Sequence, residues 1–399
     1  MSLNNTPSSE RLLIGFFGCR NAGKSSLVNA VTGQPLSVVS DVRGTTTDPV
    51  RKAMELLPVG PVVIADTPGF DDEGDLGGLR VGKTKEILRR TDVAVLVTDA
   101  VLGMQPEDRQ LLELIKERDI PCLIARNKCD LLEDIPEADP GEIYVSALRG
   151  INIWELKEEL ARIASKKESQ RRLIGDLVAE NSTVVLVCPI DESAPKGRLI
   201  LPQQLAIRDL LDQGALPYVT RDTELKSALA SLREPPAMVV TDSQVFRAVS
   251  GIVPEEIPLT SFSILMARYK GFLKSAVQGA LAVDTLKDGD CVLLAEGCTH
   301  HRQCNDIGTV KIPRWLRAHT NADITIRTCS GPDFPEDLSP FALVVHCGGC
   351  MLNEREVLHR MHLAGRQQVP FTNYGIAIAR MTGILERSVR IFPDIAGLL

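Results

Sequence analysis

The chain has 399 residues, which is longer than one ordinary hydrophobic core, and 44% of them are hydrophobic, so we expect two or three globular domains. A formal net charge of −7 disfavours a protein whose main partner is the nucleic-acid backbone. No apolar run approaches the roughly 18 residues of a membrane-spanning helix, and the N-terminus is polar and short, so we expect a cytoplasmic protein that neither enters a membrane nor binds nucleic acid.

The first third of the sequence predicts a parallel sheet. Short apolar runs alternate with amphipathic segments, and a charged helical stretch over 154–178 follows them. This alternation is typical of an α/β domain with helices on both faces of a mostly parallel sheet. We therefore expect a first domain over 1–172, with strands at 12–17, 62–65, 93–98 and 122–126.

Two further α/β regions follow, so the fold class we expect is three consecutive α/β domains. The second region, 173–263, has apolar strand-like runs at 184–187, 215–219 and 238–241 but no phosphate loop, and one use for it is packing against a second copy of the chain. The third region, 264–399, has strand-like runs at 292–295, 341–345 and 369–372.

A phosphate-binding loop is predicted at residues 18–25, which read Gly-Cys-Arg-Asn-Ala-Gly-Lys-Ser between an expected strand and an expected helix. Backbone N–H groups of such a loop cradle the phosphates. Lys24 would reach the β- and γ-phosphates, and the Ser25 hydroxyl would bind Mg²⁺. The nucleotide-binding residues expected in this segment are Gly18, Asn21, Gly23, Lys24, Ser25 and Ser26.

Two segments that follow later strands supply the metal and base contacts. Asp66 can hold Mg²⁺ through water, and Gly69 can meet the γ-phosphate. Asn127, Lys128 and Asp130 form one motif. In it, the Asp130 carboxylate can accept hydrogen bonds from the guanine N1–H and exocyclic amine. Adenine cannot supply this donor pair, so Asp130 predicts specificity for GTP.

A loop over the guanine O6 is expected at Ser146 and Ala147, and the threonine-rich segment 44–48 contains Thr46, which can close on Mg²⁺ and the γ-phosphate. With the preceding motifs, these elements make the N-terminal region resemble the TrmE- and Era-like GTPases. We expect GTP hydrolysis to GDP and phosphate. The expected catalytic residues are Lys24, Thr46, Asp66 and Gly69, with Ser25 and Thr46 as magnesium ligands.

Two departures from the pattern of many GTPases affect the expected rate of hydrolysis. Phe70 occupies the place where many GTPases carry a glutamine that orients the attacking water, and no arginine finger can be assigned. We therefore expect slow unaided turnover. Asn21 matches the loop asparagine which, in the TrmE-like group, helps to bind potassium, so the resemblance implies stimulation by K⁺.

A cysteine and histidine cluster is predicted in the third region. Cys298 and His300 follow one expected buried strand, and the run His346, Cys347 and Cys350 follows another. In an open parallel sheet, loops at the carboxyl ends of the strands converge on one site. Three thiolates and one variable ligand suit a 4Fe-4S cluster, whereas three cysteines and one histidine would equally suit structural zinc.

The spacing Cys-x-His, a gap, then His-Cys-x-x-Cys behind a GTPase domain resembles the HydF family of FeFe-hydrogenase maturation proteins over the whole chain. The resemblance implies a GTP-binding domain, a dimerisation domain and an iron-sulfur domain. It also implies a scaffold or carrier for the two-iron precursor of the hydrogenase active site. The implied partners are the FeFe-hydrogenase apoprotein, the radical-SAM maturases HydE and HydG, and a second copy of the chain in a homodimer.

By that resemblance Cys298, Cys347 and Cys350 bind the 4Fe-4S cluster, with the two histidines near its exchangeable iron. The fourth ligand stays open among His300, His346, Glu296 and water. The sequence assigns no role to His301 or Cys304, and it does not show at which step GTP acts.

Two other functions fit parts of the sequence. An RNA- or ribosome-associated GTPase with a zinc-binding C-terminal domain is the main alternative, although the acidic charge and the lack of a recognisable RNA-binding module disfavour it. A redox enzyme that uses the cluster for electron transfer is disfavoured because an incomplete cysteine set leaves one iron open.

Overall fold

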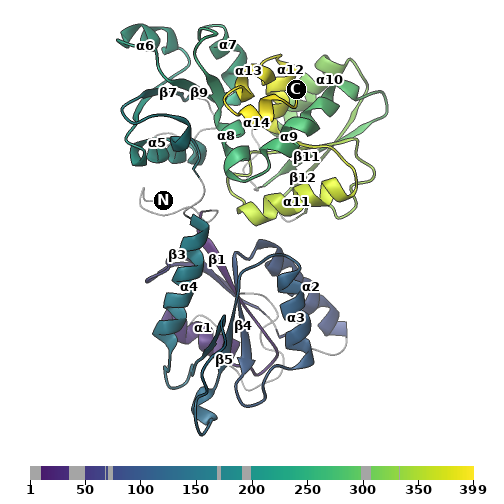
Figure 1. Cartoon of the computed structure of the whole chain (residues 1–399). Helices are drawn as coiled ribbons and strands as arrows, with labels where there is room; N and C mark the ends of the chain where they lie inside the picture. The colour runs from purple at the N-terminus through teal and green to yellow at the C-terminus, as the bar shows by residue number, and fades with distance from the viewer. Residues whose placement is uncertain are drawn as a thin grey trace. The chain divides into compact units, whose positions relative to one another are not determined.

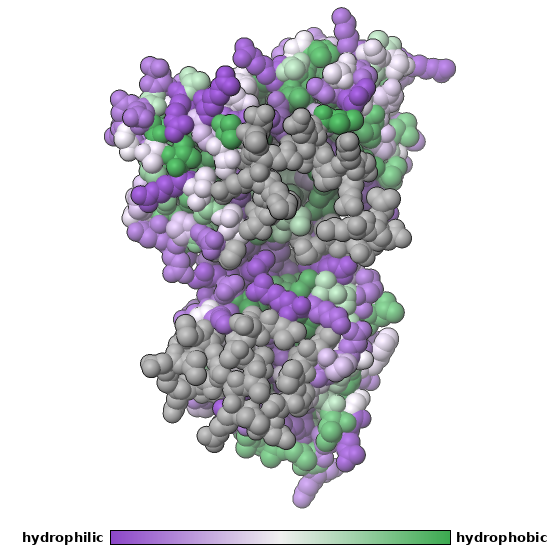
Figure 2. Space-filling view, turned by 180° about the vertical axis from the view of Figure 1, so that it is seen from behind, coloured by the Kyte–Doolittle hydropathy of each residue, from purple (hydrophilic) through white to green (hydrophobic). Residues whose placement is uncertain are grey.

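The computed structural model describes residues 10–35, 50–67, 69–70, 75–168, 172–190, 199–297, 307–331 and 333–399. It divides into two compact units, Met1–Gln170 and Arg171–Leu399 (Figure 1). None of the helices in the described ranges combines the length and apolar character needed to cross a membrane. On the face shown in Figure 2, hydrophilic and hydrophobic residues are intermingled on both units.

The first unit contains one six-stranded sheet in the order β2-β3-β1-β4-β5-β6, in which only the β2–β3 pair is antiparallel. This is the mostly parallel P-loop fold expected from the sequence. The strands are β1 (Leu12–Phe17), β2 (Val50–Leu56), β3 (Gly60–Asp66), β4 (Val93–Asp99), β5 (Cys122–Asn127) and β6 (Glu142–Tyr144).

Helices cover both faces of this sheet because its strands are apolar on both sides. Ile14 and Phe16 of β1 pack on one face, and Leu13 and Phe17 pack on the other. Side chains of α1 and α4 complete the first core, and those of α2 and α3 complete the second. The helices are α1 (Lys24–Thr32), α2 (Asp75–Arg90), α3 (Pro106–Lys116) and α4 (Ile153–Glu168), with a 3₁₀ turn η1 (Cys129–Leu131).

The second unit contains two four-stranded parallel sheets, in the orders β10-β9-β7-β8 and β12-β11-β13-β14. The strands of the first sheet are β7 (Thr183–Val187), β8 (Leu216–Thr220), β9 (Met238–Thr241) and β10 (Leu259–Ser261). Those of the second sheet are β11 (Cys291–Glu296), β12 (Thr325–Ser330), β13 (Leu343–His346) and β14 (Phe371–Asn373).

The helices of this unit lie around both sheets (Figure 1). They are α5 (Leu201–Asp212), α6 (Leu225–Ser231), α7 (Phe246–Ser250), α8 (Phe262–Tyr269), α9 (Leu273–Ala280), α10 (Ile312–Thr320), α11 (Glu354–Arg366), α12 (Tyr374–Met381), α13 (Leu385–Val389) and α14 (Pro393–Ala396). Short 3₁₀ turns lie at η2 (Gly175–Leu177), η3 (Ser243–Val245) and η4 (Leu281–Thr285), and a π-helical turn lies at η5 (Ile307–Lys311).

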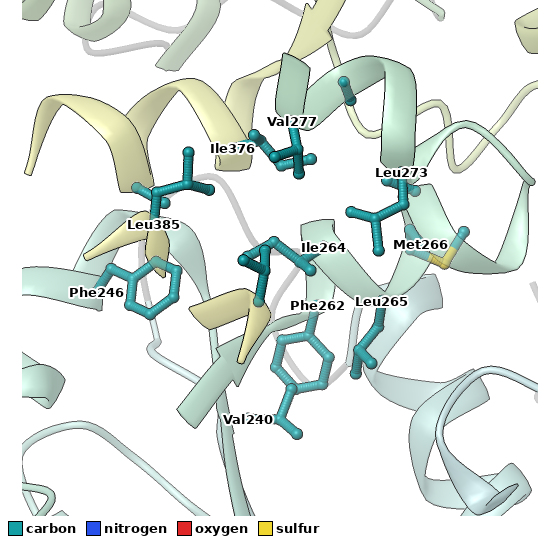
Figure 3. Close-up of a cluster of buried hydrophobic side chains, with 14 of the residues drawn as sticks. Val240, Phe246, Phe262, Ile264, Leu265, Met266, Leu273, Val277, Ile376 and Leu385 are labelled. Atoms are coloured by element: carbon teal, nitrogen blue, oxygen red, sulfur yellow. The ribbon is translucent and has the colours of Figure 1, made fainter. Parts of the chain in front are cut away.

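One hydrophobic core joins the two sheets of the second unit. Ile264 of α8 lies in a core that also contains Phe246, Leu385, Val277 and Ile376 (Figure 3). The expected boundary between residues 263 and 264 falls inside α8, so no break in packing marks it. The first unit ends at Gln170, two residues before the other expected boundary.

Four strands were not anticipated from the sequence. β2 and β12 lie at sheet edges and expose several side chains, so neither contains a clear apolar run. β6 and β10 have only three residues each, and β10 lies where the end of a domain was expected. The helix expected over 154–178 ends at Glu168, and the 3₁₀ turn η2 follows it.

Candidate functional site

The phosphate loop connects β1 to α1, and two of its glycines occupy positions that a larger residue could not. Gly18 and Gly23 have φ of 141° and 85°. A Cβ at Gly18 would lie 2.1 Å from the Val97 carbonyl oxygen, and one at Gly23 would lie 2.2 Å from Asn127 Nδ2. The loop therefore packs tightly against the ends of β4 and β5.

Lys24 begins α1 and folds back over this loop. Its Nζ donates to the carbonyl oxygens of Gly18 at 2.8 Å and Cys19 at 2.6 Å, and its side chain is buried. The ammonium is thus held at the mouth of the loop, where nucleotide phosphates bind in P-loop proteins. Ser26 follows in the first turn of α1 and is half-buried.

Ser25 and Asp66 come together at the carboxyl edge of the sheet. Ser25 Oγ donates to Asp66 Oδ2 at 2.7 Å. Asp66 is 1% exposed, and its other oxygen, Oδ1, is buried with no hydrogen-bond partner within the described ranges. A buried carboxylate oxygen without a donor, next to a hydroxyl, is an oxygen donor set that fits Mg²⁺. Gly69 lies three residues beyond Asp66, whereas Thr46 lies outside the described residues.

Asn127 joins the three segments that surround the nucleotide site. Its Nδ2 donates to the Ala22 carbonyl at 2.9 Å, and its Oδ1 accepts from the Ala147 N–H at 3.0 Å. The buried Ser146 accepts from the Arg149 N–H at 3.0 Å, which shapes the turn after β6. Asn127, one of the expected base-binding residues, is therefore hydrogen-bonded to the P-loop itself.

Lys128 and Asp130 follow Asn127 in a short turn. Lys128 has φ of 67°, and its Nζ lies 2.6 Å from Asp99 Oδ2. Burial would raise the pKa of the Asp99 carboxyl, but the Lys128 ammonium and two backbone N–H donors outweigh it, so the pKa is lowered. Asp130 lies in η1 and is half-buried, which leaves its carboxylate accessible to a base.

Asp108 is a residue of this site that the sequence reasoning missed. It lies in the first turn of α3 and is 2% exposed. Its Oδ1 accepts from the Cys19 N–H of the P-loop at 3.3 Å, and its Oδ2 accepts from the Gln105 N–H at 3.1 Å. The carboxylate thus caps α3 and supports the P-loop. The spacing of Gln105 and Asp108, which form a capping box at the start of α3, is the sequence signal that could have identified Asp108.

In the second unit, Cys347 lies directly after β13. Its N–H donates to the Ala295 carbonyl at 2.7 Å. Its Sγ accepts from the N–H groups of Gly297 at 3.0 Å and Gly349 at 3.4 Å. Burial raises the pKa of the Cys347 thiol, although both N–H donors favour the thiolate. A sulfur with two backbone donors fits a metal-bound thiolate, which needs such hydrogen bonds.

Gly297 is a second residue that the sequence reasoning missed, and it lies beside the expected ligand Cys347. A Cβ there would lie 2.8 Å from Leu352 Cγ and 3.5 Å from Cys347 Sγ. A side chain would therefore push the Gly297 N–H away from the sulfur. Its position directly before Cys298 is the sequence signal that could have identified this glycine.

Cys298 and His300 of the expected metal centre lie outside the described residues, as do His301 and Cys304, to which the sequence assigns no role. Cys350 is half-buried, three residues beyond Cys347. Glu296 ends β11, whose register pairs Ala295 with His346, so Glu296 comes next to Cys347, the residue that follows β13. In the described ranges, no three metal-binding side chains form a group that could hold a metal ion.

His346 is directed into the interior of the unit. It is fully buried, and its ring lies 5.7 Å from the Phe371 ring, centroid to centroid. Nε2 lies 3.2 Å from an Arg360 guanidinium nitrogen, which can only donate, so Nε2 accepts and Nδ1 donates to the Cys347 carbonyl at 2.7 Å. Burial and the Arg360 charge lower its pKa to about 3. Both ring nitrogens are thus hydrogen-bonded within the protein, whereas a metal ligand needs one ring nitrogen to bind the metal.

Comparison with known families identifies the second unit. A model of the hydrogen maturase F dimerization domain matches residues 173–271, and a model of the hydrogen maturase F tetramerization domain matches residues 274–391. A model described as a 50S ribosome-binding GTPase matches residues 13–128. The chain belongs to the hydrogen maturase F family. This confirms the resemblance inferred from the cysteine spacing, and the hydrogen maturase F domains support a role in hydrogenase maturation and in oligomerisation.

Curated relatives of the chain match its GTPase region. The tRNA modification GTPase MnmE of Thiobacillus denitrificans is 33% identical over 156 residues, which cover 39% of this chain and 34% of that protein. GTPase Der of Kosmotoga olearia is 31% identical over 176 residues, which cover 39% of this chain and 40% of that protein. The chain thus spans about a third of the length of MnmE, the first of these relatives.

Among solved structures, a variant of Era from Aquifex aeolicus bound to GDP and AlF₄⁻ is 20% identical, with 53% of this chain and 94% of that chain covered and a TM-score of 0.36. A TM-score at this level does not by itself establish a shared fold. The GTPase family model and the relatives confirm that the N-terminal unit of the chain is a GTPase domain, and they support GTP and Mg²⁺ as its cofactors.

Proposed function

We propose that the chain is a GTPase and a 4Fe-4S scaffold or carrier protein that assembles or delivers the two-iron precursor of the FeFe-hydrogenase active site. The observation that carries the metal part is the Cys347 sulfur, held by two backbone N–H donors at the carboxyl ends of β11 and β13. Its place within the region matched by the hydrogen maturase F tetramerization domain supports this function.

The nucleotide site performs the hydrolysis through residues of the first unit. Lys24, now bonded to loop carbonyls, would turn to the β- and γ-phosphates and neutralise their charge. Ser25, Asp66 and Thr46 would hold Mg²⁺, which would supply positive charge to the phosphates during hydrolysis. Gly69 would present its backbone N–H to the γ-phosphate, and Asp130 would select guanine.

Potassium is proposed as an activator of this site. Asn21 lies in the P-loop with φ of 61°, a conformation that asparagine tolerates, and its side chain is exposed to an incoming ion. Phe70 packs against the core on the α2 and α3 side, so it supplies no polar group to the attacking water. A cation near Asn21 would stabilise the transition state in place of an arginine finger.

At the metal centre we propose Cys298, Cys347 and Cys350 as the three thiolate ligands of the 4Fe-4S cluster. The contacts of His346 favour Glu296, His300 or water over His346 as the fourth ligand. Three thiolates leave one iron with a weak ligand, which an incoming molecule can displace. This open position is what a carrier of a two-iron precursor needs.

We propose further that the chain acts in the cytoplasm as a homodimer that contacts HydE, HydG and the hydrogenase apoprotein. The match to a dimerization domain over 173–271 supports self-association. β8 lies at the edge of its sheet and exposes Leu216 and Val219 by 54% and 44%, a surface that a second copy could cover.

Iron, sulfide and zinc analysis of the anaerobically purified protein tests this function. The expected result is about four iron and about four acid-labile sulfide per chain, as a 4Fe-4S cluster requires. The Cys347→Ala variant, purified in the same way, should lack most of this iron. Zinc without sulfide would contradict the proposal and favour the RNA- or ribosome-associated GTPase with a zinc-binding domain.

A further inference from the structure

The loop that contains Cys347 and Cys350 rests on a buried lysine. Lys270 follows α8 and is 2% exposed. Its Nζ donates to the Gly349 carbonyl at 2.6 Å and to the Leu352 carbonyl. Gly349 lies between the two cysteines with φ of 63°. One ammonium thus fixes the backbone of the loop at two points, one of them between the proposed ligands.

A buried arginine supports the same loop from α11. Arg360 is 1% exposed and bonds to Glu356 within its own helix. Its guanidinium also reaches His346 at the end of β13 and donates to the Gly331 carbonyl, after β12, at 2.6 Å. The Gly331 N–H in turn donates to the Glu296 carbonyl at 3.0 Å. Arg360 therefore joins the carboxyl ends of β11, β12 and β13.

Burying two cations beside one loop costs free energy unless other groups compensate their charges. Glu356 offsets the charge of Arg360, and two carbonyls of the loop accept hydrogen bonds from the Lys270 ammonium. A 4Fe-4S core bound by three thiolates is anionic, and its negative charge grows on reduction. Positive charge at this position would favour the anionic centre and favour its reduced form most.

We propose that Lys270 is a positioning residue of the metal centre, which fixes the loop between Cys347 and Leu352 and stabilises the negative charge of the bound cluster, with Arg360 bracing the strand ends on the other side. This inference rests on the proposed cluster-binding function. It assigns to Lys270 two separable effects, a tether through hydrogen bonds and a charge.

Three substitutions in the full chain separate the tether from the charge. Lys270→Met removes both, Lys270→Gln removes the charge but keeps an N–H donor, and Lys270→Arg keeps the charge. Lys274→Met is the matched control, because Lys274 is exposed on α9. Each variant is reconstituted anaerobically with iron and sulfide, and its fold is checked by circular dichroism.

The reduction potential of the cluster, measured by a redox titration followed by electron paramagnetic resonance, reports the charge. We expect a more negative potential in Lys270→Met and Lys270→Gln, and a potential near that of the unmodified protein in Lys270→Arg and Lys274→Met. A merely structural role would not produce this ordering. Equal potentials in all variants would overturn the proposal.

The rate at which a chelator removes iron reports the tether. We expect loss about 10-fold faster in Lys270→Met, within the range typical of residues that support metal ligands, and a smaller change in Lys270→Gln. Iron release unchanged in Lys270→Met would contradict the tether. Loss of fold in both neutral variants would assign Lys270 to the core of the unit and would also overturn the proposal.

A metal-free measurement distinguishes failure of this inference from failure of the proposed function. If the unmodified protein binds no cluster, the proposed function fails. The alkylation of Cys347 and Cys350 by iodoacetamide, followed by mass spectrometry, then still tests the tether. We expect faster alkylation in Lys270→Met than in Lys274→Met, because the loop is released from two hydrogen bonds; equal rates would refute the tether.

Discussion

Single side chains at the nucleotide site connect segments that lie far apart in the sequence. Asn127 donates to the P-loop and accepts from the loop at Ala147, and Asp108 accepts from the P-loop N–H of Cys19. The motifs predicted Asn127 because its neighbours form a known pattern. They could not predict Asp108, because its contact depends on how α3 packs against the P-loop.

Asp130 should determine the choice of base. Asp130→Asn replaces one carboxylate oxygen with an amide donor, so the exocyclic amine of guanine loses its acceptor. We expect the affinity for GTP to fall by about 100-fold or more, since hydrogen bonds to charged groups are the stronger class. Xanthine nucleotides, which carry a carbonyl oxygen in place of that amine, should bind the variant better than GTP. Titration with fluorescent guanine and xanthine nucleotides measures both; unchanged preference for GTP would exclude Asp130 from base recognition.

Asn21 should make hydrolysis depend on potassium. We expect faster phosphate release in KCl than in NaCl at the same ionic strength, because a bound K⁺ would stabilise negative charge in the transition state. Asn21→Ala should remove the difference between the two salts while leaving GTP binding nearly intact. Equal rates in both salts for the unmodified protein would disprove this role.

At the scale of elements, the proposed metal centre depends on the carboxyl ends of β11 and β13. The sequence predicted these buried parallel strands, and parallel strands place their ends at one edge. The face of each side chain was harder to predict, because it depends on register: consecutive residues of a strand point to opposite faces. Register therefore separates His346, packed under α11, from Cys347, which accepts from Gly297.

Gly297→Ala should damage the metal centre through the backbone. The added Cβ would lie 2.8 Å from Leu352 Cγ, so the end of β11 must shift and the Gly297 N–H must leave Cys347 Sγ. We expect a stability loss of about 1–3 kcal/mol, as for other overpacked sites, and a lower iron content after reconstitution. Gly348→Ala is the control, since a Cβ there meets no atom within 4 Å. Equal iron contents in the two variants would rule out this role for Gly297.

At the scale of the whole molecule, the cores define two units. The sheet of the first unit completes its cores with its own helices, and the two sheets of the second unit share one core through α8. The sequence predicted three α/β regions because it shows alternation along the chain. It could not show that the second and third regions share a core, because α8 is apolar on most sides and reads like any buried helix.

The two units should unfold as separate thermal transitions. A non-hydrolysable GTP analogue with Mg²⁺, at about 100 times its Kd, should stabilise the first unit by about 2.7 kcal/mol. We expect differential scanning calorimetry of the full chain to show one transition that moves upward with the analogue and one that does not. Lys24→Ala should abolish that movement without changing the iron content. A single transition that moves as a whole would show that the units unfold cooperatively.

The shared core of the second unit also sets the order of events during protein synthesis. Ile376 and Leu385 pack with Phe246 and Ile264, so the core of the first of its two sheets stays incomplete until α12 and α13 have left the ribosome. The first unit contains all its core residues before residue 168 and can fold earlier, since domains fold in turn as they emerge at about 5–20 residues per second. A nascent chain would therefore bind GTP before it can hold a metal centre, and chaperones would meet chiefly the unfinished second unit.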